Sequence, residues 1–265
     1  QINIGDGQSG ECYNGSCDVP SGWSSYYNGV SFCQGGPGRN NMYLENANAR
    51  GGTGKAMTFW DESCTDNFED SDGNLGKNLG KDYDELYIRY YIKFDPNYQW
   101  ALYTPQHKLG HIWYYKGRGT PYSFFTGGNR PIFVPGIHSY DAINSLYYYA
   151  TYVCEFDYKC RGTPSYKFDT GTMDHTIIGP LGTTLTDGDW HSMEYYVKMN
   201  TNNGTTFNAD GVHRFWLDGN LKYESTDIPF SDIGSDINPR RGFNYISIGG
   251  NNSNRWTRDC VGTAC

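Results

Sequence analysis

The sequence of 265 residues contains no apolar run that approaches the ~20 residues of a membrane-spanning helix, so we expect no transmembrane span. Charged residues are scarce, at 19%, and no run of basic residues occurs. The net charge is −8, which suits nucleic acid poorly because Lys and Arg must neutralise the phosphates. We therefore expect neither a membrane span nor nucleic-acid binding.

Several enzyme motifs are also missing. No Cys-x-x-Cys pair occurs, which argues against a zinc or thioredoxin-like site, and both the G-x-S-x-G motif of α/β hydrolases and the histidine motif of zincins are absent. A retaining glycosidase needs two carboxylates that flank the scissile bond. Asp84 and Glu85 are adjacent, so on a strand they would face opposite sides. The sequence therefore argues against these hydrolases and predicts no firm metal site.

Glycine and aromatic residues are abundant instead. The chain has 34 Gly, 24 Tyr, 13 Phe and 7 Trp, and aromatic residues make up 17%. This aromatic content excludes full disorder, and aromatic side chains fit a half-buried pleated surface better than a helix. Since all-β chains of this length are routinely single domains, we expect residues 1–265 to form one antiparallel β-sandwich.

Alternation of apolar with polar or aromatic side chains predicts the strands. The patterns cover residues 56–60, 84–94, 191–199, 212–218 and 245–249. Asp218-Gly219-Asn220 has the composition of a tight hairpin turn. Residues 1–40 are expected to be a loop-rich, disulfide-pinned segment. Residues 117–186 form either an elaborated insertion or two to three strands that the pattern does not place.

Eight cysteines, an even number, indicate an oxidising compartment. Proximity suggests pairing Cys12 with Cys17, Cys154 with Cys160, Cys260 with Cys265, and then Cys33 with Cys64. The alternative is free thiols in a cytosolic protein. The chain starts at Gln1 without the features of a signal peptide, which fits a mature secreted protein. Three glycosylation sequons agree with export, although they can occur by chance, at Asn14, Asn203 and Asn251.

The polar faces of the predicted strands suggest a ligand. Aligned in one sheet, they would form a concave groove of aromatic rings and charged groups. Sugars present apolar C–H faces and a fringe of hydroxyls, so such a groove suits a polysaccharide. The alternative is an ordinary solvent-facing surface of a sandwich.

Four blocks carry a resemblance to a known family. They are DELYIRYYIKFDPNYQW (84–100), HKLGHIW (107–113), DGDWHSMEYYVKMNT (187–201) and DGVHRFWLDGNLKYESTDIPF (210–230). These blocks resemble the concanavalin-A-like jelly-roll polysaccharide lyases, especially the alginate- and glucuronan-lyase-like proteins. The resemblance implies a jelly roll, a fold shared with laminin-G-like and lectin-like domains.

The sequence departs from the family pattern in two places. The family's K-L-P-G reads Lys108-Leu109-Gly110-His111 here, and residues 256–265 do not read like the family's last strand. A missing last strand would leave an unpaired sheet edge, a template for pairing with another chain. We therefore include a homo-oligomer or filament among the possible assemblies.

The resemblance implies β-elimination on a uronan. This reaction needs a group that neutralises the substrate carboxylate, a base for the adjacent proton, and an acid for the leaving oxygen. The candidate catalytic residues are Arg89, Tyr91, Lys108, His111, Tyr196 and Lys198. The candidate substrate-binding residues are Lys93, Gln106, Arg214 and Trp216. His191 and His213 are expected to be structural.

Calcium is a further candidate ligand. The stretch DNFEDSDGN supplies oxygen donors from Asp66, Glu69, Asp70, Asp72 and Asn74, but its spacing does not match an EF-hand, and a solvated acidic turn is the alternative. The sequence as a whole predicts a secreted uronan lyase. A non-catalytic extracellular protein, either a glycan-binding module or a filament subunit, is the alternative.

Overall fold

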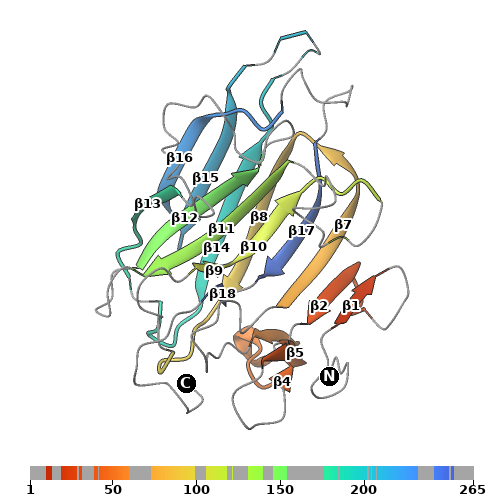
Figure 1. Cartoon of the computed structure of the whole chain (residues 1–265). Coiled ribbons are helices and arrows are strands. Elements are labelled where there is room, and N and C mark those ends of the chain that lie inside the picture. The colour runs from red at the N-terminus through yellow and green to blue at the C-terminus, as the bar shows by residue number, and fades with distance from the viewer. Residues whose placement is uncertain are drawn as a thin grey trace.

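Figure 1 shows the computed structural model of the whole chain. The residues described are 10–13, 19–28, 30–31, 39–40, 42–59, 73–98, 106–117, 121, 131–139, 146–153, 176–231 except 184, 202, 204 and 207, 242–250 and 252–253. Among them, no helix is long and apolar enough to cross a bilayer. The short 3-10 turn η1 (Arg50–Gly52) lies between β5 (Met42–Glu45) and β6 (Ala56–Phe59), which pair as a small ribbon.

Two antiparallel sheets form the body of the protein. The larger has ten strands, in the order β1-β2-β7-β17-β10-β11-β12-β13, with β9 and β18 paired beside this path. Its strands are β1 (Gly10–Tyr13), β2 (Ser25–Asn28), β7 (Gly73–Tyr83), β9 (Gln106–Lys108), β10 (Gly110–Trp113), β11 (Ile132–Ser139), β12 (Leu146–Val153), β13 (Thr176–Pro180), β17 (Phe243–Gly249) and β18 (Asn252–Ser253). A separate ribbon joins β3 (Val30–Ser31) and β4 (Arg39–Asn40).

The smaller sheet has four strands, in the order β16-β15-β14-β8. They are β8 (Glu85–Ile92), β14 (His191–Lys198), β15 (Gly211–Leu217) and β16 (Asn220–Ile228). Burial alternates along β8 and β15, as period-two patterning requires. The turn between β15 and β16 has left-handed φ values at Asp218 (51°) and Gly219 (76°), a conformation that suits a two-residue hairpin.

The main core lies between the two sheets. The rings of Tyr148 in β12 and Phe215 in β15 stack with centroids 4.0 Å apart and join the sheets at the centre. The Tyr148 hydroxyl lies 3.0 Å from Nε2 of His213, which burial keeps neutral by lowering its pKa well below 6.5. The prediction that His213 belongs to the core is confirmed.

The strands with clear alternation occur where the sequence predicts them, as β6, β8, β14, β15 and β17. The antiparallel β-sandwich is confirmed. Strand β7 was not predicted, because its sequence GNLGKNLGKDY has no apolar alternation. Residues 117–186 contribute β11, β12 and β13 to the larger sheet, which corresponds to the second of the two expectations for this segment.

The predicted disulfides stay untested, because the structure describes no cysteine side chain. Asn14 and Asn251 also lie outside the described residues. Asn203 lies in an exposed loop, where its side-chain oxygen accepts hydrogen bonds from the backbone N–H groups of Thr205 (2.9 Å) and Thr206 (2.8 Å). The chain beyond Ser253, where the family's last strand would lie, is likewise outside the description.

We expect the Phe215→Ala substitution to lower the free energy of unfolding by about 3–5 kcal/mol, because it removes a fully buried ring from the junction of the sheets. Urea denaturation measures this change. Leu221→Ala, at a side chain that is 52% exposed in the same sheet, is the control and should change stability by less than ~0.5 kcal/mol. Equal losses for the two variants would contradict the described core.

Candidate functional site

The candidate residues of the sequence fall on two different sheets. Arg89, Tyr91, Tyr196, Lys198, Arg214 and Trp216 occupy the outer face of the four-stranded sheet, and Lys93 directly follows β8. Gln106, Lys108 and His111 belong to β9 and β10 of the larger sheet. The core between the sheets separates the outer face of the smaller sheet from His111 on the far side of the larger one. The structure therefore does not bring the candidates together in one groove.

On the four-stranded sheet, Glu194 is the centre of a polar cluster. Its side chain is only 7% exposed and accepts hydrogen bonds from Nη2 of Arg89, at 2.8 Å, and from the hydroxyl of Tyr87. The ring of Tyr87 lies 6.1 Å from that of Trp216. Arg89 thus already has a carboxylate partner in this protein.

The neighbouring charges are paired in the same way. Tyr196 donates to Glu85 (2.7 Å), and Arg214 donates through Nε to Glu224. Burial raises the pKa of Tyr196, and the hydrogen bond and charge of Glu85 raise it further. A tyrosine that donates to a carboxylate and has a raised pKa is a poor base. This face therefore offers rings and cations but no good proton acceptor among these tyrosines.

On the larger sheet, Lys108 ends β9 and His111 lies in β10, with the inward-facing Leu109 between them. Glycines surround the pair. A Cβ at Gly110 would overlap the carbonyl oxygen of Ser247, and one at Gly250 would lie 2.6 Å from Cβ of Lys108 and 3.2 Å from Cε1 of His111. The absence of side chains lets the backbone pass directly beside Lys108 and His111.

A hydrogen-bond chain fixes the orientation of His111. Its Nδ1 lies 3.1 Å from Oγ of Ser247 in β17, and Ser247 donates its own proton to Oδ1 of Asn74 (3.3 Å). Because the serine proton is directed to Asn74, Nδ1 of His111 must be the donor, and Nε2 keeps its lone pair. Burial lowers the pKa of His111 well below 6.5, and the charge of Lys108 lowers it further. The imidazole is therefore neutral, with Nε2 as its basic atom.

The strand register places further residues, which the sequence did not indicate, in the same rows as Lys108 and Gln106. Lys108 stands opposite Gly136 in β11, and Gly136 stands opposite Tyr149 in β12. The next row places Gln106 opposite His138, and His138 opposite Tyr147. Each row follows from the pairing of β9, β11 and β12, which no local motif could have indicated.

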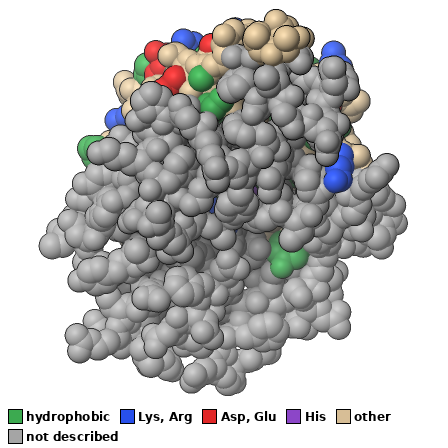
Figure 2. Space-filling view, turned by 45° about the horizontal axis from the view of Figure 1, so that its top comes forward, with side chains coloured by type: hydrophobic (Ala, Val, Ile, Leu, Met, Phe, Trp, Pro, Cys, Tyr) green, Lys and Arg blue, Asp and Glu red, His purple; other side chains and the backbone are tan. Residues whose placement is uncertain are grey.

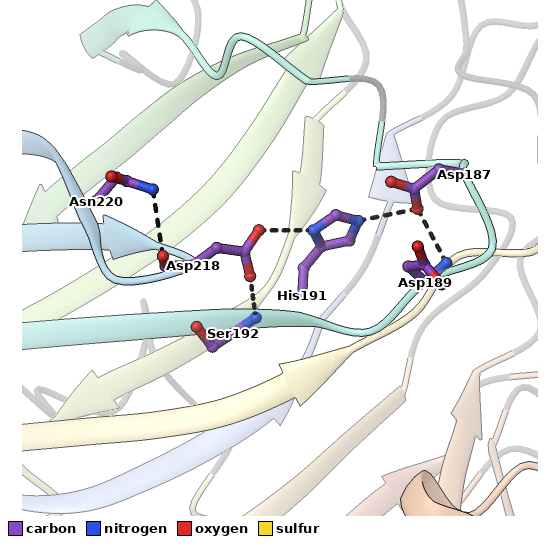
Figure 3. A network of polar contacts seen from close by, with 6 residues as sticks. All are labelled: Asp187, Asp189, His191, Ser192, Asp218 and Asn220. Carbon is purple, nitrogen blue, oxygen red and sulfur yellow. Dashed lines mark hydrogen bonds and ion pairs between the residues drawn. The ribbon is translucent and has the colours of Figure 1, made fainter.

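His191 belongs to a separate polar network at the end of the smaller sheet (Figure 3). Its Nδ1 lies 2.8 Å from Oδ2 of Asp218, and its Nε2 lies 3.1 Å from Oδ1 of Asp187. Asp218 also accepts from the backbone N–H of Ser192 (2.8 Å), and Asp187 from that of Asp189 (3.0 Å). The network joins the loop before β14 to the β15–β16 turn, in keeping with the structural role expected for His191.

The described residues give no support to a metal centre. No group of three or more potential metal ligands lies close together among them. Of the proposed calcium donors only Asn74 is described, and it is buried and bonded to Ser247. Asp66, Glu69, Asp70 and Asp72 lie outside the described residues, so the calcium prediction stays a prediction.

Two packed antiparallel sheets form a β-sandwich. The sequence matches no protein-family model and no curated protein. Among solved structures, the fold is similar to the PL-14 alginate lyase from Aplysia kurodai, with a TM-score of 0.53, 13% identity, and coverage of 80% of this chain and 77% of that chain. The endo-β-1,4-glucuronan lyase from the fungus Trichoderma reesei is also similar, with a TM-score of 0.49, 15% identity, and coverage of 92% and 84%.

The similarity to the Aplysia kurodai structure confirms the fold that the resemblance implied, that of jelly-roll polysaccharide lyases.

The His191 network predicts a pH-dependent stability. Burial alone lowers the pKa of His191, but the hydrogen bonds and charges of Asp218 and Asp187 outweigh it, and the pKa is raised above 6.5. The folded state thus binds this proton more tightly than the unfolded chain. The resulting stabilisation is complete below the ordinary pKa and is lost as the pH rises through the raised value.

We therefore expect the stability advantage of the wild type over His191→Gln to shrink as the pH rises from about 6 to about 8. Urea denaturation across this range measures the difference, and NMR titration of the imidazole gives the pKa directly. In Asp187→Asn, which lacks one partner carboxylate, the pKa of His191 should fall. A stability difference between the two proteins that is constant with pH, or a His191 pKa below 6.5, would rule out a protonated His191 held by Asp187 and Asp218.

Proposed function

We propose that this protein is a secreted polysaccharide lyase that cleaves a uronan by β-elimination, with Lys108 and His111 at its reaction site. The observation that carries the proposal is a neutral histidine, held in one tautomer by Ser247, next to a lysine. β-Elimination needs this combination of a base and a carboxylate-neutralising cation. The lyase fold and the Lys-Leu-Gly block support the same function.

In the proposed reaction, the half-buried residue Lys108 binds the uronate carboxylate through its ammonium and stabilises the negative charge that develops there. Nε2 of His111 takes the proton from the carbon next to the carboxylate. The electron pair forms the new carbon–carbon double bond as the bond to the glycosidic oxygen breaks. The leaving oxygen receives a proton, a role that we assign to Tyr149 because the backbone pairing of β9, β11 and β12 sets this residue in the same row as Lys108.

We assign the reaction to the face of the larger sheet, and not to the four-stranded sheet, because of the protonation states of the candidate bases. The hydroxyls of Tyr87 and Tyr196 donate to glutamates, whereas His111 is neutral and keeps a basic nitrogen. Arg89 and Arg214 already bind carboxylates of the protein itself. A uronate at the four-stranded sheet would meet cations but no comparable base.

The test follows the ultraviolet absorbance of the unsaturated uronate product on alginate, glucuronan and pectate. We expect Lys108→Ala to lower kcat by about 10²–10³-fold, because it removes charge stabilisation from the transition state. The matched control is Lys222→Ala, at an exposed lysine of β16, which should keep the wild-type rate. An Arg89→Ala variant is measured beside them.

The outcomes separate the two faces. If Arg89→Ala loses activity while Lys108→Ala keeps it, the reaction takes place on the four-stranded sheet and the assignment to Lys108 and His111 is wrong. If folded wild-type protein forms no product on any polymer, the lyase proposal fails in favour of a non-catalytic extracellular protein.

A further inference from the structure

The outer face of the four-stranded sheet carries an exposed set of apolar side chains that the proposed reaction does not use. Among the described residues, the exposed large hydrophobic side chains are Tyr87 (54%), Tyr91 (39%) and Leu221 (52%). Tyr87 and Tyr91 lie in β8, and Leu221 stands opposite Trp216. Exposed apolar groups gathered on one face mark an interaction site more often than single ones do.

The outward positions of β8 alternate rings with cations. They read Tyr87, Arg89, Tyr91 and, just beyond the strand, Lys93. Alternate residues of a strand lie ~6.6 Å apart, so rings and positive charges repeat regularly along the sheet. Strand β14 continues the pattern sideways, because Tyr196 stands opposite Tyr87.

Four cations lie over rings of this surface. Arg50, from η1, lies 3.5 Å from the ring centroid of Tyr91, and Lys93 lies 5.6 Å from that of Trp190. Arg89 lies 5.9 Å from the centroid of Tyr87, and Arg214 lies 5.6 Å from that of Tyr196. A group that contacts these rings would therefore also lie close to a positive charge.

The face is less acidic than the protein as a whole. Its basic side chains are Arg50, Arg89, Lys93, Lys198 and Arg214, and its acidic ones are Glu85, Glu194 and Glu224. The aspartates at its end, Asp187 and Asp218, are held by His191. Counted with both aspartates, the five basic and five acidic side chains balance, whereas the whole chain has a net charge of −8.

Both arginines retain donors beyond their ion pairs. Arg89 contacts Glu194 and Tyr87 through Nη2, and Arg214 contacts Glu224 through Nε. The Arg89 side chain is 51% exposed. A guanidinium has five N–H groups, so each arginine can bind an external carboxylate while it keeps its internal partner.

We infer that this face, defined by Tyr87, Arg89, Tyr91, Lys93 and Lys198, is a docking surface for an anionic polysaccharide. The apolar faces of the sugars would stack on the tyrosines, and their carboxylates would pair with the cations of the next row. The inference goes beyond the proposed function, since this surface holds a polymer without cleaving it.

The exposed cations favour this occupant over two others. A neutral glycan would gain nothing from the charges of Arg89 and Lys93. A second copy of the chain, docked face to face by a two-fold axis, would bring like charges together. A polyanion is the partner whose charge complements the face.

The experiment is native electrophoresis in gels that contain either alginate or the uncharged hydroxyethyl cellulose. All variants carry Lys108→Ala, so that the polymer stays intact. The test variant adds Lys93→Gln and Lys198→Gln. The control adds Lys81→Gln and Lys222→Gln, which remove the same charge from exposed lysines outside the proposed docking surface. Tyr91→Ala tests the ring without a change of charge.

We expect alginate to retard the parent protein, and the test variant to bind about five- to tenfold more weakly, as the loss of two exposed ion pairs implies. Tyr91→Ala should also weaken binding, and the control should stay within about twofold of the parent. Retardation should fall with added salt.

Four results would overturn the inference. They are no retardation of the folded parent by alginate, equal weakening of the test and control variants, equal retardation by the uncharged polymer, and sedimentation showing a dimer that the test variant abolishes. Product formation by Lys108→Ala would instead count against the proposed reaction site, while retardation decides the docking surface.

Discussion

The packing of the two sheets through their buried rings is the constraint on which the rest of this structure depends. The ring of Tyr148 stacks on that of Phe215 across the sandwich. Within the smaller sheet, the ring centroids of Tyr195 and Phe215 are 5.3 Å apart. Side chains alternate strictly along a strand, so a shift of one residue would turn each of these rings outward. Burial of the rings therefore also determines which residues face solvent on β8, β14 and β15.

This constraint divides the polar residues of the chain between two surfaces. On the smaller sheet, it places Tyr87, Arg89 and Glu194 in one cluster. There, Tyr87 and Arg89 both donate hydrogen bonds to Glu194, a residue of the same face. On the larger sheet, it places His111 beside Ser247, with Asn74 as the next partner. In the first cluster, the charge of Arg89 is paired with that of Glu194. In the second, hydrogen bonding orients a neutral His111. The two proposals thus assign polymer binding to one side of the sandwich and the reaction to the other.

The sequence predicts the strands and their outward residues well, because alternation along β8, β14 and β15 is a local property. It could not predict the sheet to which each strand belongs. Arg89 and Lys108 are 19 positions apart, and nothing local shows that β8 joins β14 while β9 joins β11. Both the division of the candidate site and the row from Lys108 to Tyr149 depend on this long-range pairing. Strand β7 escaped prediction for a related reason, since β2 and β17 pair along its glycine-rich sequence.

The two tryptophan-containing motifs of the resemblance also gain a physical reason. Trp190-His191, in the block 187–201, supplies the histidine, and Trp216-Leu217-Asp218-Gly219, in the block 210–230, supplies Asp218, which has a left-handed φ and whose carboxylate contacts that histidine. These motifs therefore mark how the ends of β14 and β15 are joined, which explains why they indicate the fold and not the reaction.

The negative charge of the whole chain need not oppose an anionic substrate. At physiological ionic strength, charges more than about 8 Å apart in solvent are largely screened, so a polymer responds mainly to the surface it touches. In Figure 2, acidic and basic side chains of the described residues stand side by side at the upper edge, so charge of one sign does not cover that part of the molecule. The exposed cations on the four-stranded sheet would therefore act locally on a polyanion. If this surface holds a polymer as proposed, the polymer stays near the protein between reactions, which raises its concentration at Lys108 without any change in the reaction itself.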